Sequence, residues 1–389
     1  MISLIIPSHN NLRHLKNAYI SIRKHAPEAE LILIDDASTD GTYEWLQHQT
    51  NTDNKLIILK SDERKGHTVL YDLGIQHATK SIVGIMHADM IMGPNYIENI
   101  LKNLLPGKVV CGTRIEPPLH PEGKEKIIKN FGLDFDDLDI PSFESFCLEQ
   151  QEVDSNKVTS GMFAPWVIYK SDFVAMGGHD AIFAPFPYED SDIFQRWMIA
   201  GYELVQARDA FVYHLTCRGH RWTEQIQKDD DYYKRVSFEA ARNYLRKWGS
   251  WIKNDEYQHP IIPNKYDIGY VIKNCNLQIL YNIEPLSTTV YVEDQSLIDE
   301  YVDTFQKETR LDLRDRVKNT KVKPTNDVVI EIDAKNITSS EVSLIEKCPD
   351  ILAQLQEPGD YELGTALVRV KNHEPKKYKL PFLAVKNIF

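Results

Sequence analysis

Several features that define other classes of protein are missing from this chain of 389 residues. Its five cysteines are far apart and include no C-x-x-C pair, which argues against a disulfide scaffold or a zinc knuckle. No apolar run approaches the roughly 18 residues that span a bilayer, and the first residues do not resemble a signal peptide. Basic residues number 45 against 57 acidic ones, a net charge of −12. We therefore expect a cytoplasmic protein with no nucleic-acid partner.

Glycine-rich phosphate loops are also absent. The first apolar run is followed by PSHNNLRHLKN, which contains no glycine. A dinucleotide oxidoreductase needs G-x-G-x-x-G at this place, and a P-loop protein needs its own glycine-rich signature. A sugar-1-phosphate nucleotidyltransferase, which remains an alternative, also needs a glycine-rich loop near its first helix.

The first 110 residues alternate between apolar strands and amphipathic helices. We predict strands at 2–8, 30–36, 55–61 and 81–89, and helices at 11–26, 38–49, 66–79 and 93–104. Short connections and nearly continuous apolar strands are typical of a parallel sheet with helices on both faces. The predicted fold class of this part is therefore α/β, with a mostly parallel, Rossmann-like sheet.

The pattern changes along the rest of the chain. Residues 114–157 lack clear periodicity, which predicts an irregular binding loop or lid. A helix is expected at 191–201, two short strands within 202–214, and a long helix from Thr223 to Trp251. A linker around Pro260 and Pro263 then leads to a second domain of α+β type at 264–389. Within it we predict helices at 296–308 and 340–355, and strands at 277–283, 288–294, 326–333 and 365–372.

Polar residues stand at the end of each of the first four predicted strands. Ligands bind beyond the carboxyl ends of strands in an open parallel sheet, so these residues are expected to line one site. A single acid at a strand end is more often a turn former or a helix cap, but four polar ends on one edge favour a binding site. The four ends are Ser8-His9-Asn10, Asp35-Asp36, Ser61-Asp62 and His87-Ala88-Asp89.

Six segments give the chain a resemblance to a known family. SLIIPSHN, LILIDDASTDGT, KGHTVLYDLGIQHA, HAD, VAMGGHD and YEDSDIFQRW resemble, in order and approximate spacing, the family-2 glycosyltransferases of GT-A fold. The resemblance covers about residues 1–225 and implies a catalytic domain there. It further implies metal-dependent, inverting transfer of a sugar from a nucleotide diphosphate, most often UDP, to a hydroxyl of a glycan or glycoconjugate acceptor. Residues 226–263 would be the long helix and linker, and 264–389 resemble no known domain.

Donor binding is assigned first from this resemblance. Asp36 would contact the base and Asp35 would be secondary, since carboxylates accept hydrogen bonds from base N–H groups and ribose hydroxyls. Arg64 and Lys65 either meet the phosphates or belong to a solvated run of charges. His9 either stacks on the base or is a turn residue. The same pocket would be lined by Pro7, Ser8, His9, Asn10 and Ala88.

The family holds its metal with a D-x-D motif, which here reads His87-Ala88-Asp89. Asp89 is therefore the expected ligand of Mn²⁺ or Mg²⁺. His87 is a second ligand, a donor to ribose or phosphate, or only a strand-end residue. His214 stands where similar enzymes complete the metal site. The following Arg218 and Arg221 either close over the pyrophosphate or pack on the acidic surface.

The acceptor hydroxyl needs a base to take its proton. Glu189, Asp190 and Asp192 stand at the start of a helix, where the dipole alone favours acids. The resemblance to the family's E-D motif points to Asp190 as base and to Glu189 as its orienting neighbour, with Asp192 as runner-up. Further acceptor contacts are expected from Trp166, which is otherwise a core residue, and from Gly177 and Gly178, which permit a sharp turn.

Two readings of the whole chain stay open beside the enzyme. The altered HAD motif is compatible with a non-catalytic module that only binds nucleotides or glycans. The long helix from Thr223 mixes aromatic and basic residues, which is typical of a connecting helix or of an interfacial helix. The interfacial reading gives peripheral membrane contact.

Overall fold

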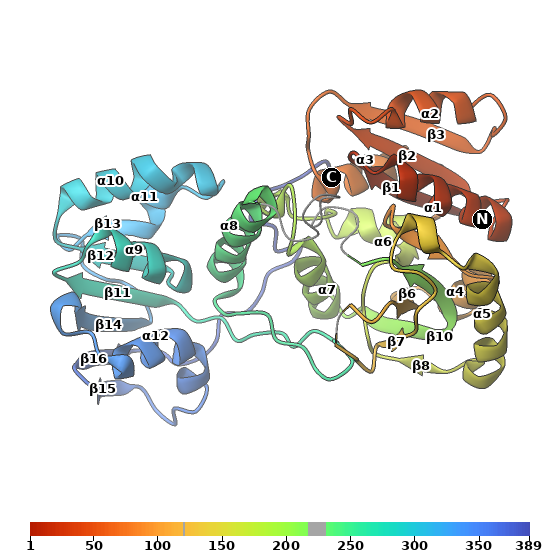
Figure 1. The fold of residues 1–389 in the computed structure, drawn as a ribbon. Coiled ribbons are helices and arrows are strands. Elements are labelled where there is room, and N and C mark those ends of the chain that lie inside the picture. Colours follow the sequence, from red (N-terminus) through yellow and green to blue (C-terminus); the bar gives the residue numbers. More distant parts are fainter. Residues whose placement is uncertain (120, 217–230) are drawn as a thin grey trace. The chain divides into compact units, whose positions relative to one another are not determined.

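The computed structural model describes residues 1–119, 121–216 and 231–389, and it divides into two compact units (Figure 1). Unit 1 comprises 1–237, 254–261 and 380–389, and unit 2 comprises 238–253 and 262–379. These limits assign parts of the expected helix and linker at 226–263 to both units. No helix among the described residues is long and apolar enough to cross a membrane.

Unit 1 is built on a ten-stranded sheet in the order β3-β2-β1-β4-β9-β6-β10-β5, with β7 beside β6 and β8 beside β10. The first four strands run parallel, as do β6, β7 and β10, which confirms the predicted fold class. Strands β5, β8 and β9 pair antiparallel with their neighbours. The strands are β1 (Ile2–Ser8), β2 (Glu30–Asp36), β3 (Leu56–Ser61), β4 (Ile82–Ile85), β5 (Met90–Met92), β6 (Lys108–Glu116), β7 (Lys126–Ile128), β8 (Val158–Thr159), β9 (Trp166–Tyr169) and β10 (Glu203–His214).

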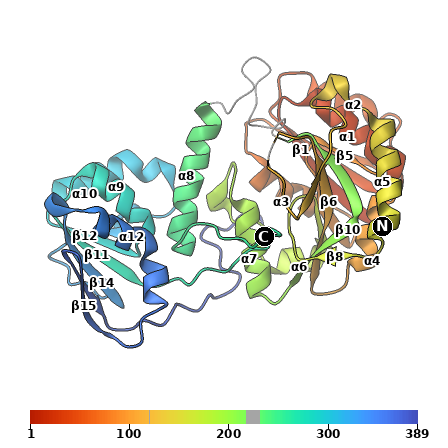
Figure 2. The same cartoon turned by 60° about the horizontal axis from the view of Figure 1, so that its bottom comes forward.

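Helices cover both faces of this sheet (Figures 1 and 2). Alternate side chains of a strand point to opposite faces, so on β1 Leu4 and Ile6 pack with α1, α2 and α4, whereas Ile5 packs with α3, α6 and α7. The two apolar cores hold the sheet between them and leave its carboxyl edge for polar groups. The helices are α1 (Leu12–His25), α2 (Thr42–Gln49), α3 (His67–His77), α4 (Tyr96–Asn103), α5 (Ile140–Asp154), α6 (Lys170–Ala175) and α7 (Glu189–Ile199), with short 3₁₀ turns η1 (Phe135–Asp137) and η2 (Ala181–Phe183). The next helix, α8 (Asp231–Trp248), begins in unit 1 and continues in unit 2.

The prediction of an irregular segment at 114–157 was wrong for much of its length, although 117–119, 121–125 and 129–134 form neither helix nor strand. Strand β6 extends to Glu116, and most of the later part is the helix α5. Asp139 caps this helix by accepting the Ser142 N–H at 3.1 Å, and Phe143 and Cys147, four residues apart, are buried on its inner side. Asp139 and Pro141, an acid and a proline of this segment, are therefore the cap and a first-turn residue of α5.

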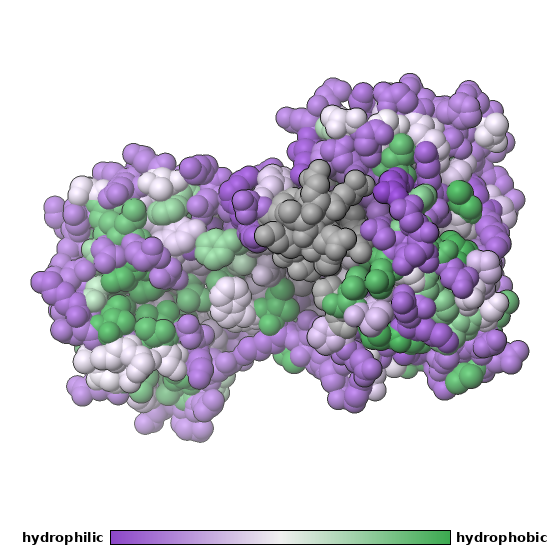
Figure 3. Space-filling view, in the orientation of Figure 1, coloured by the Kyte–Doolittle hydropathy of each residue, from purple (hydrophilic) through white to green (hydrophobic). Residues whose placement is uncertain are grey.

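Unit 2 has a six-stranded sheet in the order β13-β12-β11-β14-β16-β15. The first four of these strands are parallel, and β15 and β16 add an antiparallel hairpin. On the face drawn in Figure 3, apolar side chains gather on unit 2 among hydrophilic ones. Its elements are β11 (Ile268–Lys273), α9 (Leu277–Ile283), η3 (Glu284–Leu286), β12 (Thr289–Val292), α10 (Gln295–Phe305), η4 (Gln306–Glu308), α11 (Leu313–Arg316), β13 (Val317–Asn319), β14 (Val328–Asp333), η5 (Ala334–Asn336), α12 (Ser339–Leu352), β15 (Gly359–Leu363) and β16 (Ala366–Val370).

Two elements of unit 2 differ from the prediction. Leu277–Ile283 forms a helix instead of a strand, because Asn276 caps it by accepting the Ile279 N–H at 2.9 Å. Leu280 and Ile283 are buried at helical spacing. The central strand β11 was not predicted, since Gly269 interrupts its apolar run. A Cβ at Gly269 would lie 2.3 Å from Asn326 Oδ1, so the glycine allows this close approach.

A buried carboxylate ties several elements of unit 2 together. Glu284, fully buried, accepts hydrogen bonds from Arg246 Nη2 at 2.7 Å and from Tyr301 Oη at 3.0 Å, and it also pairs with Arg316. Burial alone would raise the pKa of Glu284, but the two guanidinium groups lower it to about 2. The four side chains come from α8, η3, α10 and α11, so one ion cluster organises most of one side of the unit.

Replacing Glu284 with Gln should destabilise unit 2 by roughly 3–5 kcal/mol, since it leaves buried guanidinium groups without their carboxylate. The stabilisation from an acid with a lowered pKa is present above its unfolded pKa of about 4.3 and is lost as the pH falls through about 2. Urea unfolding followed by circular dichroism between pH 7 and pH 2 measures both effects. The control is Glu331→Gln at a half-exposed pair with Arg369, which should change stability by less than about 1 kcal/mol; equal effects of the two changes would contradict the assignment.

Candidate active site

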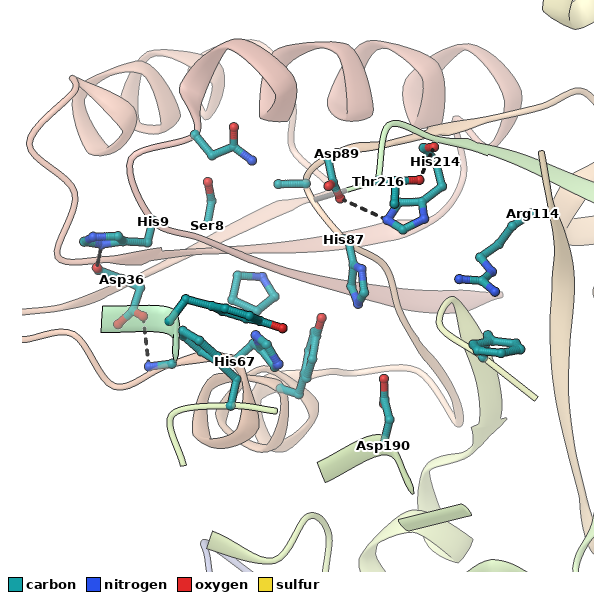
Figure 4. A pocket seen from close by; sticks show the side chains of 18 of the residues that line it. Ser8, His9, Asp36, His67, His87, Asp89, Arg114, Asp190, His214 and Thr216 are labelled. Atoms are coloured by element: carbon teal, nitrogen blue, oxygen red, sulfur yellow. Dashed lines mark hydrogen bonds and ion pairs between the residues drawn. The ribbon is translucent and has the colours of Figure 1, made fainter. Parts of the chain in front are cut away.

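A cavity of about 530 Å³ opens in unit 1 at the carboxyl ends of β1, β2 and β4 (Figure 4). This is the edge at which the sequence placed four polar strand ends. Asn11, rather than the predicted Asn10, follows the first strand into the cavity. The predicted residues that line the cavity are Pro7, Ser8, His9, Asp36, Arg64, His87, Ala88, Asp89, Asp190 and His214.

Asp36 closes one end of the cavity. Its Oδ1 accepts the Lys65 N–H at 2.7 Å and its Oδ2 accepts the Gly66 N–H at 2.9 Å. His9 Nδ1 lies 2.6 Å from the Asp36 carbonyl oxygen, so the imidazole donates to it. The carboxylate thus joins the end of β2 to the start of α3, and each oxygen has a lone pair left for a ligand.

Three other predicted donor residues lie outside the cavity. Asp35 is fully buried, because neighbouring strand residues face opposite sides of the sheet, and its Oδ1 accepts the Ser38 N–H at 3.2 Å. Asn10 is exposed and accepts the Thr39 N–H at 2.7 Å. Lys65 is exposed and contributes its backbone to Asp36 rather than its ammonium to the cavity. These three assignments are corrected accordingly.

Arg64 reaches the cavity from the same loop. Its guanidinium carbon lies 4.5 Å from the centre of the Tyr232 ring and 5.5 Å from that of Phe186. It forms no ion pair with any carboxylate of the described residues, so its charge remains available for an anion. Arg218 and Arg221 lie outside the described residues.

Three side chains form a cluster that can hold a metal ion. One ligand atom each of His87, Asp89 and His214 lies within 4.8 Å of the others, and His214 Nε2 is 3.8 Å from Asp89 Oδ1. The pairing of β5 with β10 sets Met90 opposite His214 and thereby brings Asp89 beside it. Two imidazole nitrogens and one carboxylate oxygen suit Mn²⁺ and tolerate Mg²⁺, which prefers oxygen ligands.

Glu116, which the sequence analysis missed, orients His214. Its Oε1 lies 2.9 Å from His214 Nδ1, which leaves Nε2 directed at Asp89. Arg114 and Lys126 pair with the same carboxylate at 3.1 and 3.0 Å. Burial opposes its charge, but His214 and the two cations outweigh it and lower the pKa of Glu116. A carboxylate behind a ligating histidine is the usual outer support of a metal site.

The other side of the cavity is formed by the start of α7. Asp190 lines the cavity there, opposite Asp89 and His214, with its carboxyl group pointing inward (Figure 4). Burial and the adjacent Glu189 carboxylate raise the pKa of Asp190 to about 6. Glu189 itself is buried behind the wall, and its Oε1 lies 2.7 Å from His67 Nε2. Burial would raise the pKa of Glu189, but the charge and hydrogen bond of His67 lower it.

Asp192 is excluded as a base. It is fully buried one turn along α7, and its Oδ2 accepts from Arg196 Nε at 2.8 Å. Arg196 in turn donates to the carbonyl oxygens of Met176 and Gly178. Asp192 therefore balances a buried guanidinium instead of facing the cavity.

The predicted acceptor contacts are also corrected. Trp166 is fully buried, with its ring 5.0 Å from that of Trp197, so it belongs to the core. Gly177 and Gly178 have φ values of 75° and 68°, but added Cβ atoms would lie 2.7 Å from Leu383 and 2.2 Å from Asp72. Both glycines make room within the protein and do not line the cavity.

The segment 380–389 contributes to this crowding through Leu383 at Gly177 and Phe389 at Gly178. The backbone N–H groups of Ala384 and Val385 donate to Asp180 at 2.6 and 2.9 Å, and Asn387 Nδ2 donates to Asp72 at 2.7 Å. Phe389 packs on the same core, with its ring 5.8 Å from that of Phe173. The segment therefore completes the wall behind α3 and α6.

Comparison with known proteins shows what part of the chain is similar to. Residues 3–162 match the model described as glycosyl transferase family 2. The undecaprenyl-phosphate mannosyltransferase of Micrococcus luteus is 26% identical over 116 residues, 29% of this chain and 48% of the relative. Glycosyltransferase GlyG of Streptococcus pneumoniae serotype 4 is 28% identical over 105 residues, 27% of this chain and 35% of the relative. Within unit 1, residues 3–162 are therefore similar to glycosyl transferase family 2.

The likeness has limits. The chain spans less than half the length of these curated relatives. Among solved structures, the mannosyltransferase PcManGT of Pyrobaculum calidifontis, in complex with GDP-Man and Mn²⁺, matches with a TM-score of 0.41 and 18% identity, over 63% of this chain and 69% of that one. A likeness of this degree supports no conclusion about the site.

Replacing Glu116 with Gln should weaken Mn²⁺ binding by about 10- to 100-fold, because the amide no longer fixes the ring of His214 by charge. Electron paramagnetic resonance of free Mn²⁺ titrated with protein measures this affinity without any turnover. The control is Glu122→Gln at an exposed site, which changes the net charge equally and should leave the affinity as it is. An unchanged affinity in the Glu116 variant would remove its supporting role.

Proposed function

We propose that the protein is a metal-dependent, inverting glycosyltransferase. It transfers a sugar from a nucleotide diphosphate, with UDP as the favoured nucleotide, to a hydroxyl of a glycan or glycoconjugate. The observation that carries this proposal is the placement of two groups in one cavity of a family-2 domain. The cluster of His87, Asp89 and His214 lies on one side, and Asp190 lies on the other.

The donor is proposed to lie with its base at Asp36 and its diphosphate at the cluster. The free lone pairs of Asp36 accept hydrogen bonds from the base, and His9 lines the same end. Arg64 lines the same cavity and forms no ion pair within the described part of the chain, so its guanidinium can donate to phosphate oxygens. This orientation directs the anomeric carbon toward the side of Asp190.

The departing diphosphate gains negative charge as the glycosidic bond breaks. A Mn²⁺ or Mg²⁺ ion held by Asp89, His214 and His87 would stabilise that charge as a Lewis acid. The two imidazoles favour Mn²⁺ of the pair. His87, where the family usually has an acid, also avoids a further negative charge beside the diphosphate.

Asp190 is proposed as the general base. Its carboxylate takes the proton of the acceptor hydroxyl while the oxygen forms a bond to the anomeric carbon. The bond from that carbon to the diphosphate breaks, and its electron pair leaves with the diphosphate oxygen. Because attack and departure occur on opposite sides of the carbon, the configuration inverts. A base with a pKa near the working pH is well suited to this step.

Replacing Asp89 with Asn should remove the Mn²⁺-dependent binding of UDP, because the only carboxylate of the cluster is lost. Thermal shift with UDP, with and without Mn²⁺, detects this, since a ligand that binds only the folded state raises its melting temperature. The same replacement at the exposed Asp62 is the control. A full Mn²⁺-dependent shift in the Asp89 variant would exclude its role as a ligand.

Replacing Asp190 with Asn should lower the transfer rate by about 100-fold or more and leave UDP binding in place. In the unchanged protein the rate should rise with pH through about 6, as the carboxyl group loses its proton. The release of nucleoside diphosphate from UDP-glucose, UDP-N-acetylglucosamine and GDP-mannose, measured from pH 4.5 to 8, tests both effects. A near-normal rate in the variant would require a different base.

A further inference from the structure

His67 lies between the donor end and the base side of the cavity, and the proposed reaction gives it no task. It is the first residue of α3 and directly follows Gly66, whose N–H donates to Asp36. Its Nε2 lies 2.7 Å from Glu189 Oε1. A carboxylate only accepts hydrogen bonds, so the imidazole donates. The dipeptide Gly66-His67 therefore contacts Asp36 through its backbone and Glu189, the neighbour of Asp190, through the imidazole.

The ring of His67 is fixed by its surroundings. It stacks on Phe186 with ring centres 5.4 Å apart and planes inclined by 17°, and the ring of Tyr71 lies 5.5 Å away. The next residue, Thr68, donates its hydroxyl to the Pro185 carbonyl oxygen at 3.0 Å. The loop that leads into α7 is thus attached to the start of α3, and the imidazole holds a defined place between them.

Glu189 needs such a partner. Only 4% of the residue is exposed, and its Oε2 is buried without a hydrogen-bond partner among the described residues. The next residue is Asp190, whose Oδ1 is also buried without a hydrogen-bond partner among the described residues. The buried carboxylate of Glu189 and the partly buried carboxylate of Asp190 repel each other, and each loses hydration. Without a donor on Glu189, its side chain would turn toward water or take up a proton, and the first turn of α7 would shift.

We propose that His67 is a positioning residue for the reaction. By donating to Glu189, it fixes that carboxylate and keeps the first turn of α7 oriented so that Asp190 faces the acceptor hydroxyl. This inference rests on the proposed function, in which Asp190 is the base. The lowered pKa of Glu189 and the raised pKa of Asp190 agree with a charge held on the first and a basic carboxylate on the second.

Two substitutions of His67 separate its hydrogen bond from its bulk. His67→Phe keeps an aromatic ring on Phe186 but has no donor, whereas His67→Gln keeps a donor without the ring. We expect His67→Phe to lower kcat by about 10- to 100-fold with UDP affinity changed less than about twofold, and His67→Gln to recover most of the rate. Turnover is followed with UDP-glucose, UDP-N-acetylglucosamine and GDP-mannose, and UDP affinity by calorimetry with Mn²⁺. The control on the same helix is His77→Gln, an exposed residue outside the cavity.

A double-mutant cycle tests whether His67 acts through Glu189. If it does, His67→Phe should not lower kcat any further when Glu189 is already replaced by Gln. Additive losses would overturn the inference, as would an equal loss of UDP affinity and of rate. A second test does not depend on turnover. The NMR chemical shift of the His67 imidazole N–H should change in Glu189→Gln and stay the same in the exposed Glu63→Gln. An unchanged chemical shift in Glu189→Gln would also refute the contact.

The inference and the proposed function fail differently. A normal rate in Asp190→Asn would refute the role of Asp190 as base. The contact between His67 and Glu189 would then be tested by the imidazole N–H resonance of His67 alone. A lost rate in Asp190→Asn together with a normal rate in His67→Phe would refute only the positioning role.

Discussion

The Asp36 carboxylate is the contact on which the arrangement of the cavity depends. It accepts two backbone N–H groups from Lys65 and Gly66 and so joins the end of β2 to the start of α3. The loop can approach because Gly66 has no side chain: a Cβ there would lie 2.3 Å from Pro185. Arg64 precedes this junction in the chain and His67 follows it, so the junction connects the proposed donor end of the cavity with the side of the proposed base.

The sequence predicted the fold of unit 1 and the edge at which its site lies. Strand-end polarity correctly brought Ser8, Asp36 and Asp89 to one cavity. The same rule applied to β6 would have found Glu116, but this strand was expected to lie outside regular structure beyond residue 114. The rule also failed to separate Asp35 from Asp36: both are buried, but side chains alternate between faces, so a shift of one position decides which carboxylate lines the cavity.

Contacts between distant segments could not be predicted. His67 and Glu189 are 122 positions apart and meet only because the loop before α7 packs on α3. Trp166, Gly177 and Gly178 have the residue types of an acceptor site, yet Trp166 packs on Trp197 in the core, and Leu383 and Phe389 crowd the two glycines. Likewise, Asp192 pairs with the buried Arg196 one turn along the helix, whereas Asp190 lines the cavity. The residue types indicate which reactions the side chains could support, but the packing determines which of these side chains reach the cavity.

The return of the segment 380–389 to unit 1 has a consequence for the order in which the protein forms. A ribosome makes the chain from its N-terminus, so all of 262–379 in unit 2 is synthesised before Asn387 can reach Asp72. Until then Asp72 lacks one of its donors, and the core around Phe173 lacks Phe389. The packing of unit 1 around Asp72 and Phe173 is therefore completed only after unit 2 has been synthesised.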